Sequence, residues 1–158
     1  MPDCSGGQFL GRTVTIGVSL ACSATVPASF DIIGTSRGLS FSSSRGTVDV
    51  TNRSSGNVRE YINDYLDGTI SCDGTLVRDA TDQSKLIREY FLDSSVETAH
   101  GWIQLTIPEE TGDTTTLEVP VVFTAYDNDF AYETLSTFSF EANFNGAPVL
   151  TDIPAPAE

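Results

Sequence analysis

The sequence predicts a mainly β protein with two packed antiparallel sheets, as a β-sandwich or partly open barrel, and one α-helix. Most segments alternate apolar and polar residues, turn-forming residues separate them, and only one segment has helical spacing. Strands with one apolar and one polar face pack as two layers around a core. The 158 residues suffice for a single domain spanning 1–158.

The first elements follow from composition and alternation. Residues 1–11 are rich in glycine and polar residues and are expected to form an N-terminal arm. Apolar residues alternate with small or polar ones over 13–20, which predicts a strand rather than the secretory core that residues 14–22 superficially resemble. A loop to Gly34 and a strand over 37–50, with a turn at 45–46, come next.

Residues 51–66 lack clean alternation and are predicted to form a long inter-strand loop. Loops of this length in compact domains are usually functional or disordered. Tyr61, Ile62, Tyr65 and Leu66 give this loop side chains to bury, so we expect it to bind a partner. A strand over 68–77 should follow it.

The single helix is expected over residues 80–92. Leu86, Ile87, Tyr90 and Phe91 form one apolar stripe at helical spacing. Asp79 or Thr81 can cap its first turn.

The second half is predicted to contain only strands and turns. In chain order the sequence predicts a strand at 100–107, a hairpin tip at 109–113, a strand at 117–125, a turn at 127–129 and a strand at 137–144. Residues 145–158 end in alternating proline and alanine and are expected to form an extended C-terminal arm with no core to join.

Charge excludes one broad class of function. The chain has 22 acidic and 8 basic residues, and all 8 bases lie in residues 1–88, leaving 13 acids and no base in residues 89–158. Binding to nucleic acid depends on neutralising phosphates with Lys and Arg. We therefore expect no direct DNA or RNA binding.

No catalytic constellation emerges. Residues 34–38 (GTSRG) match the nucleophile-elbow pattern around Ser36, but that motif needs a helix after the serine, and here the following residues alternate like a strand. His100 is the only histidine that could act as a base. We expect a turn into a strand here and no enzyme.

No cofactor or metal is expected either. Cys4, Cys22 and Cys72 are far apart and lack zinc-ligand spacing, so they indicate only folding in a reducing compartment. Asp127, Asp129 and Glu133 lack the glycine and the further oxygens of a calcium loop, and a solvated turn is the better interpretation.

The motif over residues 47–56, TVDVTNRSSG, followed by Val58-Arg59-Glu60, resembles the siphophage major tail protein family of tail tube proteins, which includes related gene transfer agent tail proteins. The order of elements after it, a strand rich in Ser and Gly, a short helix and a β-rich half, is also similar. The resemblance spans roughly 37–144. One departure is Asn57-Val58, where the family often has Gly-Trp.

This resemblance implies a structural virion protein. It implies that the chain self-assembles into stacked hexameric rings, forming the hollow tail tube through which phage DNA is ejected. It further implies assembly in the host bacterial cytoplasm, residence in the virion tail, and no membrane association. Implied partners are the tape measure protein in the lumen, the tail terminator, the baseplate or tail tip proteins, and passing genomic DNA that is not specifically bound.

Two sets of residues are candidates for these roles. The charged and aromatic side chains of the predicted loop are candidates for contacts between neighbouring copies: Arg53, Arg59, Glu60, Tyr61 and Tyr65. Acids expected to face the lumen, where they would repel DNA, are Asp73, Glu118, Glu133 and Glu141.

Three alternatives stay open from sequence. A secreted β-sandwich adhesin or carbohydrate-binding module would share the strands and acidity, with Trp102, Tyr126 and Tyr132 as its aromatic platform. A head decoration or tail terminator protein would coat or cap without polymerising end to end. An esterase would use Ser36.

Overall fold

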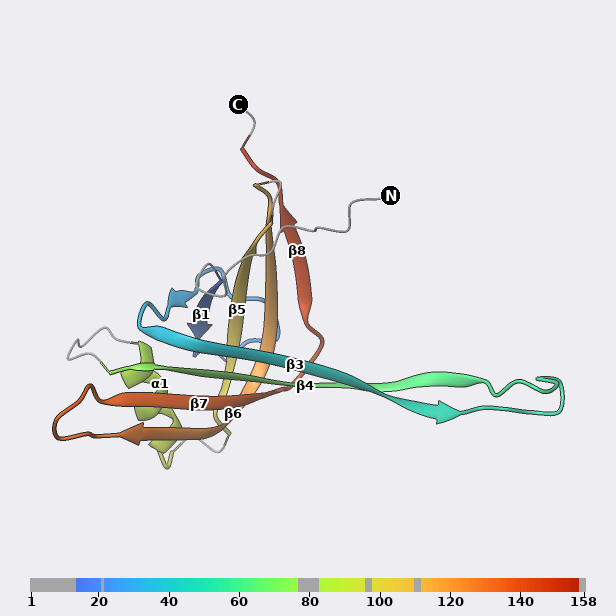
Figure 1. Cartoon of the computed structure of the whole chain (residues 1–158), viewed down its shortest axis with the longest axis horizontal. Coiled ribbons are helices and arrows are strands. Elements are labelled where there is room, and N and C mark those ends of the chain that lie inside the picture. The colour runs from blue at the N-terminus through green and yellow to red at the C-terminus, as the bar shows by residue number, and fades with distance from the viewer. Residues whose placement is uncertain (1–13, 21, 77–82, 96–97, 110–111, 157–158) are drawn as a thin grey trace.

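The computed structural model describes residues 14–20, 22–76, 83–95, 98–109 and 112–156 (Figure 1). Eight strands and one helix occur in these residues. In chain order they are β1 (Thr15–Ser19), β2 (Asp31–Ile32), β3 (Ser36–Asp49), β4 (Tyr61–Thr75), α1 (Gln83–Leu92), β5 (His100–Pro108), β6 (Thr114–Asp129), β7 (Thr137–Phe144) and β8 (Val149–Ile153).

All eight strands belong to one antiparallel sheet in the order β2-β1-β5-β6-β7-β4-β3, with β8 also paired to β6. The first half of β6 pairs with β5 and β8, and its second half pairs with β7. Figure 1 shows the result as two leaves set at an angle: an upper leaf of β1, β5, β8 and the start of β6, and a lower leaf of β3, β4, β7 and the end of β6.

The predicted mainly β fold with one helix is therefore confirmed, but the prediction of two separate sheets is wrong. Both leaves share β6, whose register shifts between Phe123 and Ala125. An extra residue in one strand bends it locally and breaks the regular ladder. That irregularity lies where β6 passes from one leaf to the other, so the sheet folds over itself without a separate second sheet.

The hydrophobic core lies between the two leaves. The inward rows of the strands supply fully buried side chains, among them Ile70, Ile103, Val119 and Phe138. Phe123 and Phe140 meet edge to face with ring centroids 5.7 Å apart, a favourable aromatic geometry. Helix α1 contributes Ile87, which is completely buried in the same cluster.

The predicted loop over 51–66 is shorter than expected. Residues 61–66 belong to β4 and pair with the end of β3, with Asp49 opposite Tyr61, Val48 opposite Ile62 and Arg45 opposite Leu66. The predicted turn at 45–46 is instead a register shift inside β3. Alternation fails to reveal these strand residues because neither face of this ribbon is buried.

Two further boundaries differ from the prediction. Strand β6 continues to Asp129, so the predicted turn at 127–129 is strand and the connection to β7 lies at 130–136. Part of the predicted C-terminal arm forms β8, which pairs with β6 from Glu118 opposite Val149 to Thr114 opposite Ile153. The predicted arm at 1–11 and the helix caps Asp79 and Thr81 lie outside the described residues.

Replacing Phe138 tests the position of the core. Phe138 is 1% exposed, and truncating a fully buried Phe to Ala costs about 3–5 kcal/mol of unfolding free energy. We expect Phe138→Ala to lose that amount in urea unfolding followed by circular dichroism. Its neighbour Ser139 lies on the other face of β7, so Ser139→Ala should stay within about 0.5 kcal/mol of the parent. Equal losses for both variants would contradict the assigned register.

Candidate assembly surfaces

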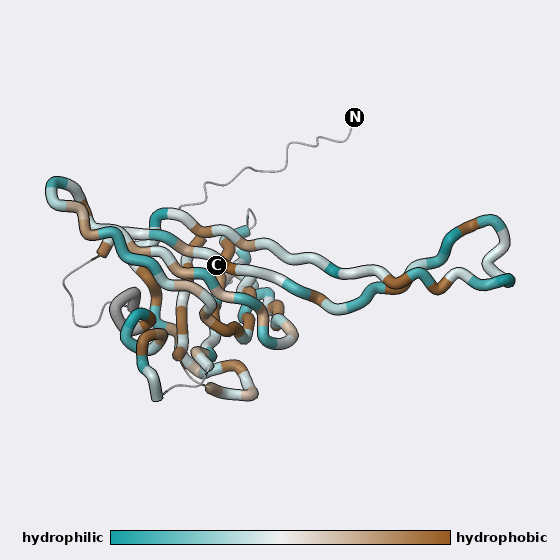
Figure 2. Tube along the Cα trace, turned by 90° about the horizontal axis from the view of Figure 1, so that it is seen from below, coloured by the Kyte–Doolittle hydropathy of each residue, from teal (hydrophilic) through white to brown (hydrophobic). Residues whose placement is uncertain are grey.

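A two-stranded ribbon projects from the body. The pairing of β4 with β7 ends at Thr69 opposite Asn143, while β3 and β4 remain paired out to Asp49 opposite Tyr61. We call residues 43–68 the hairpin arm (Figures 1 and 2). At about 3.3 Å per residue, residues 43–49 alone carry it roughly 20 Å beyond the body.

The sequence motif at 47–56 builds the tip of this arm. The Asp49 carboxylate accepts hydrogen bonds from the Thr51 hydroxyl and from its N–H at 2.9 Å, which hold the pKa of Asp49 below its ordinary value. The Asn52 side chain accepts bonds from the N–H and hydroxyl of Ser54. Gly56 then adopts a φ of +64°, a conformation that favours glycine. These local bonds give the tip a defined turn.

The arm exposes apolar side chains on both faces. Val48 and Ile62 are opposite each other on one face, Tyr61 lies on the other, and Tyr65 lies where the β3–β4 register shifts; all four are exposed. An isolated two-stranded hairpin is marginally stable in water at best. The arm is therefore a surface suited to contact with another molecule.

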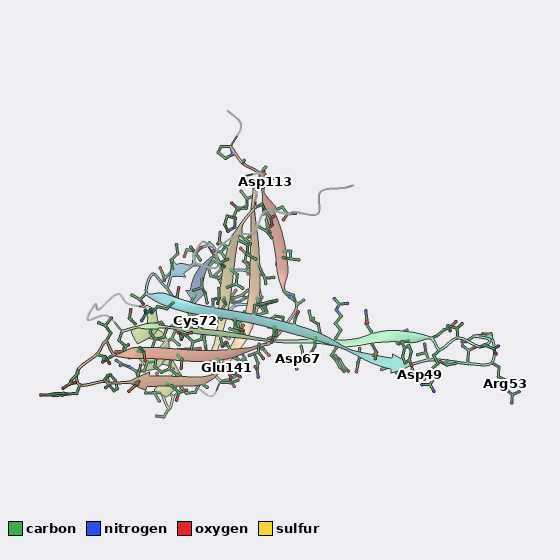
Figure 3. The ribbon with its side chains drawn as sticks, in the orientation of Figure 1. Asp49, Arg53, Asp67, Cys72, Asp113 and Glu141 are labelled. Atoms are coloured by element: carbon green, nitrogen blue, oxygen red, sulfur yellow. The ribbon has the colours of Figure 1, made fainter. Side chains whose placement is uncertain are left out.

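All five predicted interface residues lie on this arm. Arg53 and Arg59 are in the connection between β3 and β4, with Glu60 beside them, and Tyr61 and Tyr65 are on β4. Figure 3 shows Arg53 at the far end of the arm. Each of the five is exposed. Within the described part of the chain, neither arginine makes a hydrogen bond or an ion pair.

The outer face of the lower leaf is acidic. Strand alternation and register place five exposed carboxylates on it: Asp67, Asp73, Asp127, Asp129 and Glu141. Between Gly38 and Ser44 of β3, Asp67 and Thr75 of β4, Thr137 and Asn143 of β7, and Ala125 and Asp129 of β6, the other positions of this face are Ser, Thr, Asn, Gly or Ala, and none is Lys or Arg. We call this surface the acidic face. It has a shallow depression of about 200 Å³ beside Asp73, Asp127 and Glu141.

Two of the four predicted lumen acids lie on this face. Asp73 and Glu141 are on neighbouring strands, with Asp73 opposite Ser139 and Glu141 opposite Ser71. The Asp73 carboxylate lies directly over Gly38, where a Cβ would collide with it. Glu118 is on the upper leaf and accepts a 3.0 Å bond from Gln104, and Glu133 is in the connection between β6 and β7. The sequence analysis did not predict the other three: Asp67 fell between the predicted loop and the strand after it, and Asp127 and Asp129 fell in a predicted turn.

The lower leaf also presents two strand edges. β3 is the last strand of the sheet order, and in the described residues only β4 pairs with it. On the opposite side, β5 pairs with β6 only as far as Val122, so among the strands that the structure describes the end of β6 pairs with β7 alone. Unpaired strand edges template pairing with other strands.

The geometry offers no catalytic or metal centre among the described residues. Ser36 opens strand β3 and is followed by strand, not by the helix that a nucleophile elbow requires. No group of three or more His, Cys, Asp or Glu is placed to hold a metal ion in the described ranges. No described helix has the length and apolar character to cross a membrane.

The aromatic platform of a carbohydrate-binding module does not form. Trp102 is 5% exposed, and its indole N–H donates to the Ser23 carbonyl at 3.0 Å. Tyr126 is partly buried against the core, whereas Tyr132 is exposed in the connection between β6 and β7. The three rings are therefore not presented together.

These features define a β protein whose described surfaces suit contact with other chains rather than catalysis. Comparison with protein families matches residues 16–150 to the family described as phage tail tube protein. The chain belongs to this family, and it is a structural component of the virion tail rather than an enzyme. None of the curated proteins matches the sequence significantly.

Solved structures show the same fold. The tail of an empty gene transfer agent particle, refined with C6 symmetry, matches with a TM-score of 0.65 and 24% identity over 91% of this chain and 99% of that one. The SPP1 tail tube matches with a TM-score of 0.64 and 13% identity over 94% of this chain and 81% of that one. The baseplate of the anti-feeding prophage matches with a TM-score of 0.56 and 9% identity over 87% and 91%.

Because the thiol of Cys72 is buried, we expect the free energy of unfolding to fall at alkaline pH. Burial, with a smaller contribution from the Asp73 carboxylate, raises the pKa of Cys72 from 9.0 to about 12. Above pH 9 the unfolded chain loses this proton while the folded chain keeps it, so stability is full below pH 9 and falls as the pH rises towards 12. We expect a loss on the order of 2 kcal/mol at pH 10.5 relative to pH 8, measured by urea unfolding.

Cys72→Ala is the control for that measurement. The variant should be less stable than the parent at pH 8, because it loses buried side-chain volume, but it should lack this part of the alkaline fall. A parent and a variant with parallel pH profiles would show that Cys72 does not cause the effect.

Proposed function

We propose that the chain closes into hexameric rings that stack into the hollow tail tube through which DNA leaves the virion. The observation that carries this proposal is the lower leaf, which combines two unpaired edges with an outer face that has acids and no bases in its described positions. Family membership and the C6 symmetry of the similar gene transfer agent tail support the sixfold arrangement.

Ring closure would use the two edges of the lower leaf. The β3 edge of one copy pairs with the end of β6 in the next copy, so that the leaves of six copies form one continuous barrel. Each copy offers a different edge to each neighbour, and such a head-to-tail contact closes into a ring when the rotation fits. Closure also removes the exposed edges that otherwise invite aggregation.

The acidic face would then line the lumen. Asp73 and Glu141 are the predicted lumen acids on this face, and Asp67, Asp127 and Asp129 join them. Repeated around a ring and along a tube, these carboxylates repel phosphates, so DNA passes without being held. The lumen positions of Glu118 and Glu133 stay predictions, because neither lies on this face.

The hairpin arm would link neighbouring rings. Its reach beyond the body and its exposed Arg53, Arg59, Glu60, Tyr61 and Tyr65 are suited to contacts across a ring junction. The remaining proposed partners are the tape measure protein in the lumen and the tail terminator and baseplate or tail tip proteins at the ends of the tube. Assembly would take place in the host bacterial cytoplasm.

Negative-stain microscopy of concentrated purified protein tests the assembly itself. We expect hollow rods of constant diameter, with end views showing sixfold rings, and a concentration-dependent shift to large species in sedimentation velocity. A protein that stays monomeric at every concentration would contradict the proposal.

Reversing the charge of the lumen tests the role of the acidic face. Asp73→Lys with Glu141→Lys should slow or arrest DNA ejection from particles carrying the variant tube, because attraction per ring sums along the tail. Asp31→Lys with Asp152→Lys is the matched control, since it makes the same change in net charge on β2 and β8, which do not belong to the lower leaf. Equal ejection rates for both variants, measured by fluorescence of released DNA, would argue against an acidic lumen.

A further inference from the structure

The connection between β6 and β7 exposes three large apolar side chains to water. Phe130 and Leu135 are 70% and 71% exposed, and Tyr132 is fully exposed. We call residues 130–136 the β6–β7 turn. Three such side chains close together in a loop seven residues long exceed the scattered exposure normal for a soluble surface, and clusters of this kind mark contact sites.

The turn and the hairpin arm lie at opposite ends of the same leaf. Strands β3 and β4 run from the body out to the tip of the arm, while the β6–β7 turn closes the far end of that leaf (Figure 1). Copies stacked in one orientation along this direction therefore bring the arm of one copy towards the turn of the next. A contact between two different patches of this kind propagates without closing, as a filament does.

The charges of the two ends are complementary. The tip of the arm, residues 50–60, carries two bases, Arg53 and Arg59, against one acid, Glu60, and neither arginine has a partner within the described residues. The turn carries Glu133 and follows directly after Asp127 and Asp129, with no basic residue in 127–136. Opposite charges at facing patches fix orientation and register, and like charges suppress the reversed stacking.

The apolar surfaces also match. The arm presents Val48 and Ile62 on one face and Val58 at its tip, all exposed. Large aromatic and aliphatic side chains that are exposed in one copy supply most of the binding energy when a partner buries them. Neither the arm nor the turn buries these side chains within its own copy.

We propose that the β6–β7 turn of one copy receives the hairpin arm of a copy in the adjacent ring. This inference rests on the proposed tube and adds the receiving surface, with Phe130, Tyr132 and Leu135 as its apolar contacts. The occupant is a second copy of this chain, bound head to tail.

Replacing two apolar side chains of the β6–β7 turn by alanine tests their contribution to stacking. Tyr132→Ala with Leu135→Ala should raise the critical concentration for tube formation at least about tenfold, since burying one large apolar side chain is worth roughly that factor. Leu92→Ala is the matched control, because Leu92 is also 70% exposed but ends α1. It should leave the critical concentration unchanged. An unchanged value for the double variant overturns the inference.

Disulfide crosslinking tests the contact directly. In a background of Cys4→Ser and Cys22→Ser, Val58→Cys with Tyr132→Cys places one thiol at each end of the leaf. Oxidised tubes should then give a ladder of crosslinked multimers on a denaturing gel, because each copy bonds to the next. Val58→Cys with Leu92→Cys should give no ladder.

The outcomes separate this inference from the proposed function. Tubes that form normally but yield no Val58–Tyr132 ladder overturn the arm–turn contact and leave the tube intact. Failure of the parent protein to form tubes at any concentration overturns the tube, and the contact between rings with it.

Discussion

The structure depends on one strand, β6, taking part in both leaves. Its first half pairs with β5 and β8 and its second half with β7, and the irregularity at Phe123–Ala125 lets it bend between them. The bend turns one sheet back on itself, so the apolar rows of both leaves face a common core. The lower leaf is thereby held with its polar face outward, its edges free and its two long strands directed away from the body. Each proposed assembly surface is a consequence of that arrangement.

Sequence patterning predicted those strands that bury one face. The alternation around Ile16, Ile103 and Phe140 placed β1, β5 and β7 to within two residues, because the hydrophobic effect imposes a period of two on any half-buried strand. The outer parts of β3 and β4 obey no such rule. Backbone pairing alone holds Val48 opposite Ile62, with water on both sides, so their side chains carry no burial signal. β8 was not predicted from the sequence for the same reason, since all five of its residues are exposed.

The candidate site was predictable in its type but only partly in its residues. The motif at 47–56 located the arm, and its five predicted contact residues do lie there. The residues of the acidic face were harder to predict, because which residues share a face depends on how the strands pair. Asp73 and Glu141 share it through the β4–β7 register, whereas Glu118 lies on the other leaf and Glu133 falls in a turn. Asp127 and Asp129 belong to it only because β6 runs longer than its turn-forming residues suggested.

The exposed arm makes the newly synthesised subunit vulnerable to aggregation until a neighbouring copy covers the arm. A ribbon with two exposed faces and exposed β-branched and aromatic residues has the composition of an aggregation-prone segment. Here Arg45, Asp49, Asp64 and Arg59 flank or interrupt its apolar positions. Charges placed in this way act as gatekeepers, because an out-of-register pairing brings like charges together or leaves them unpaired. The apolar side chains of the arm thus remain available for one correct partner, while the charges between them keep the unassembled subunit soluble.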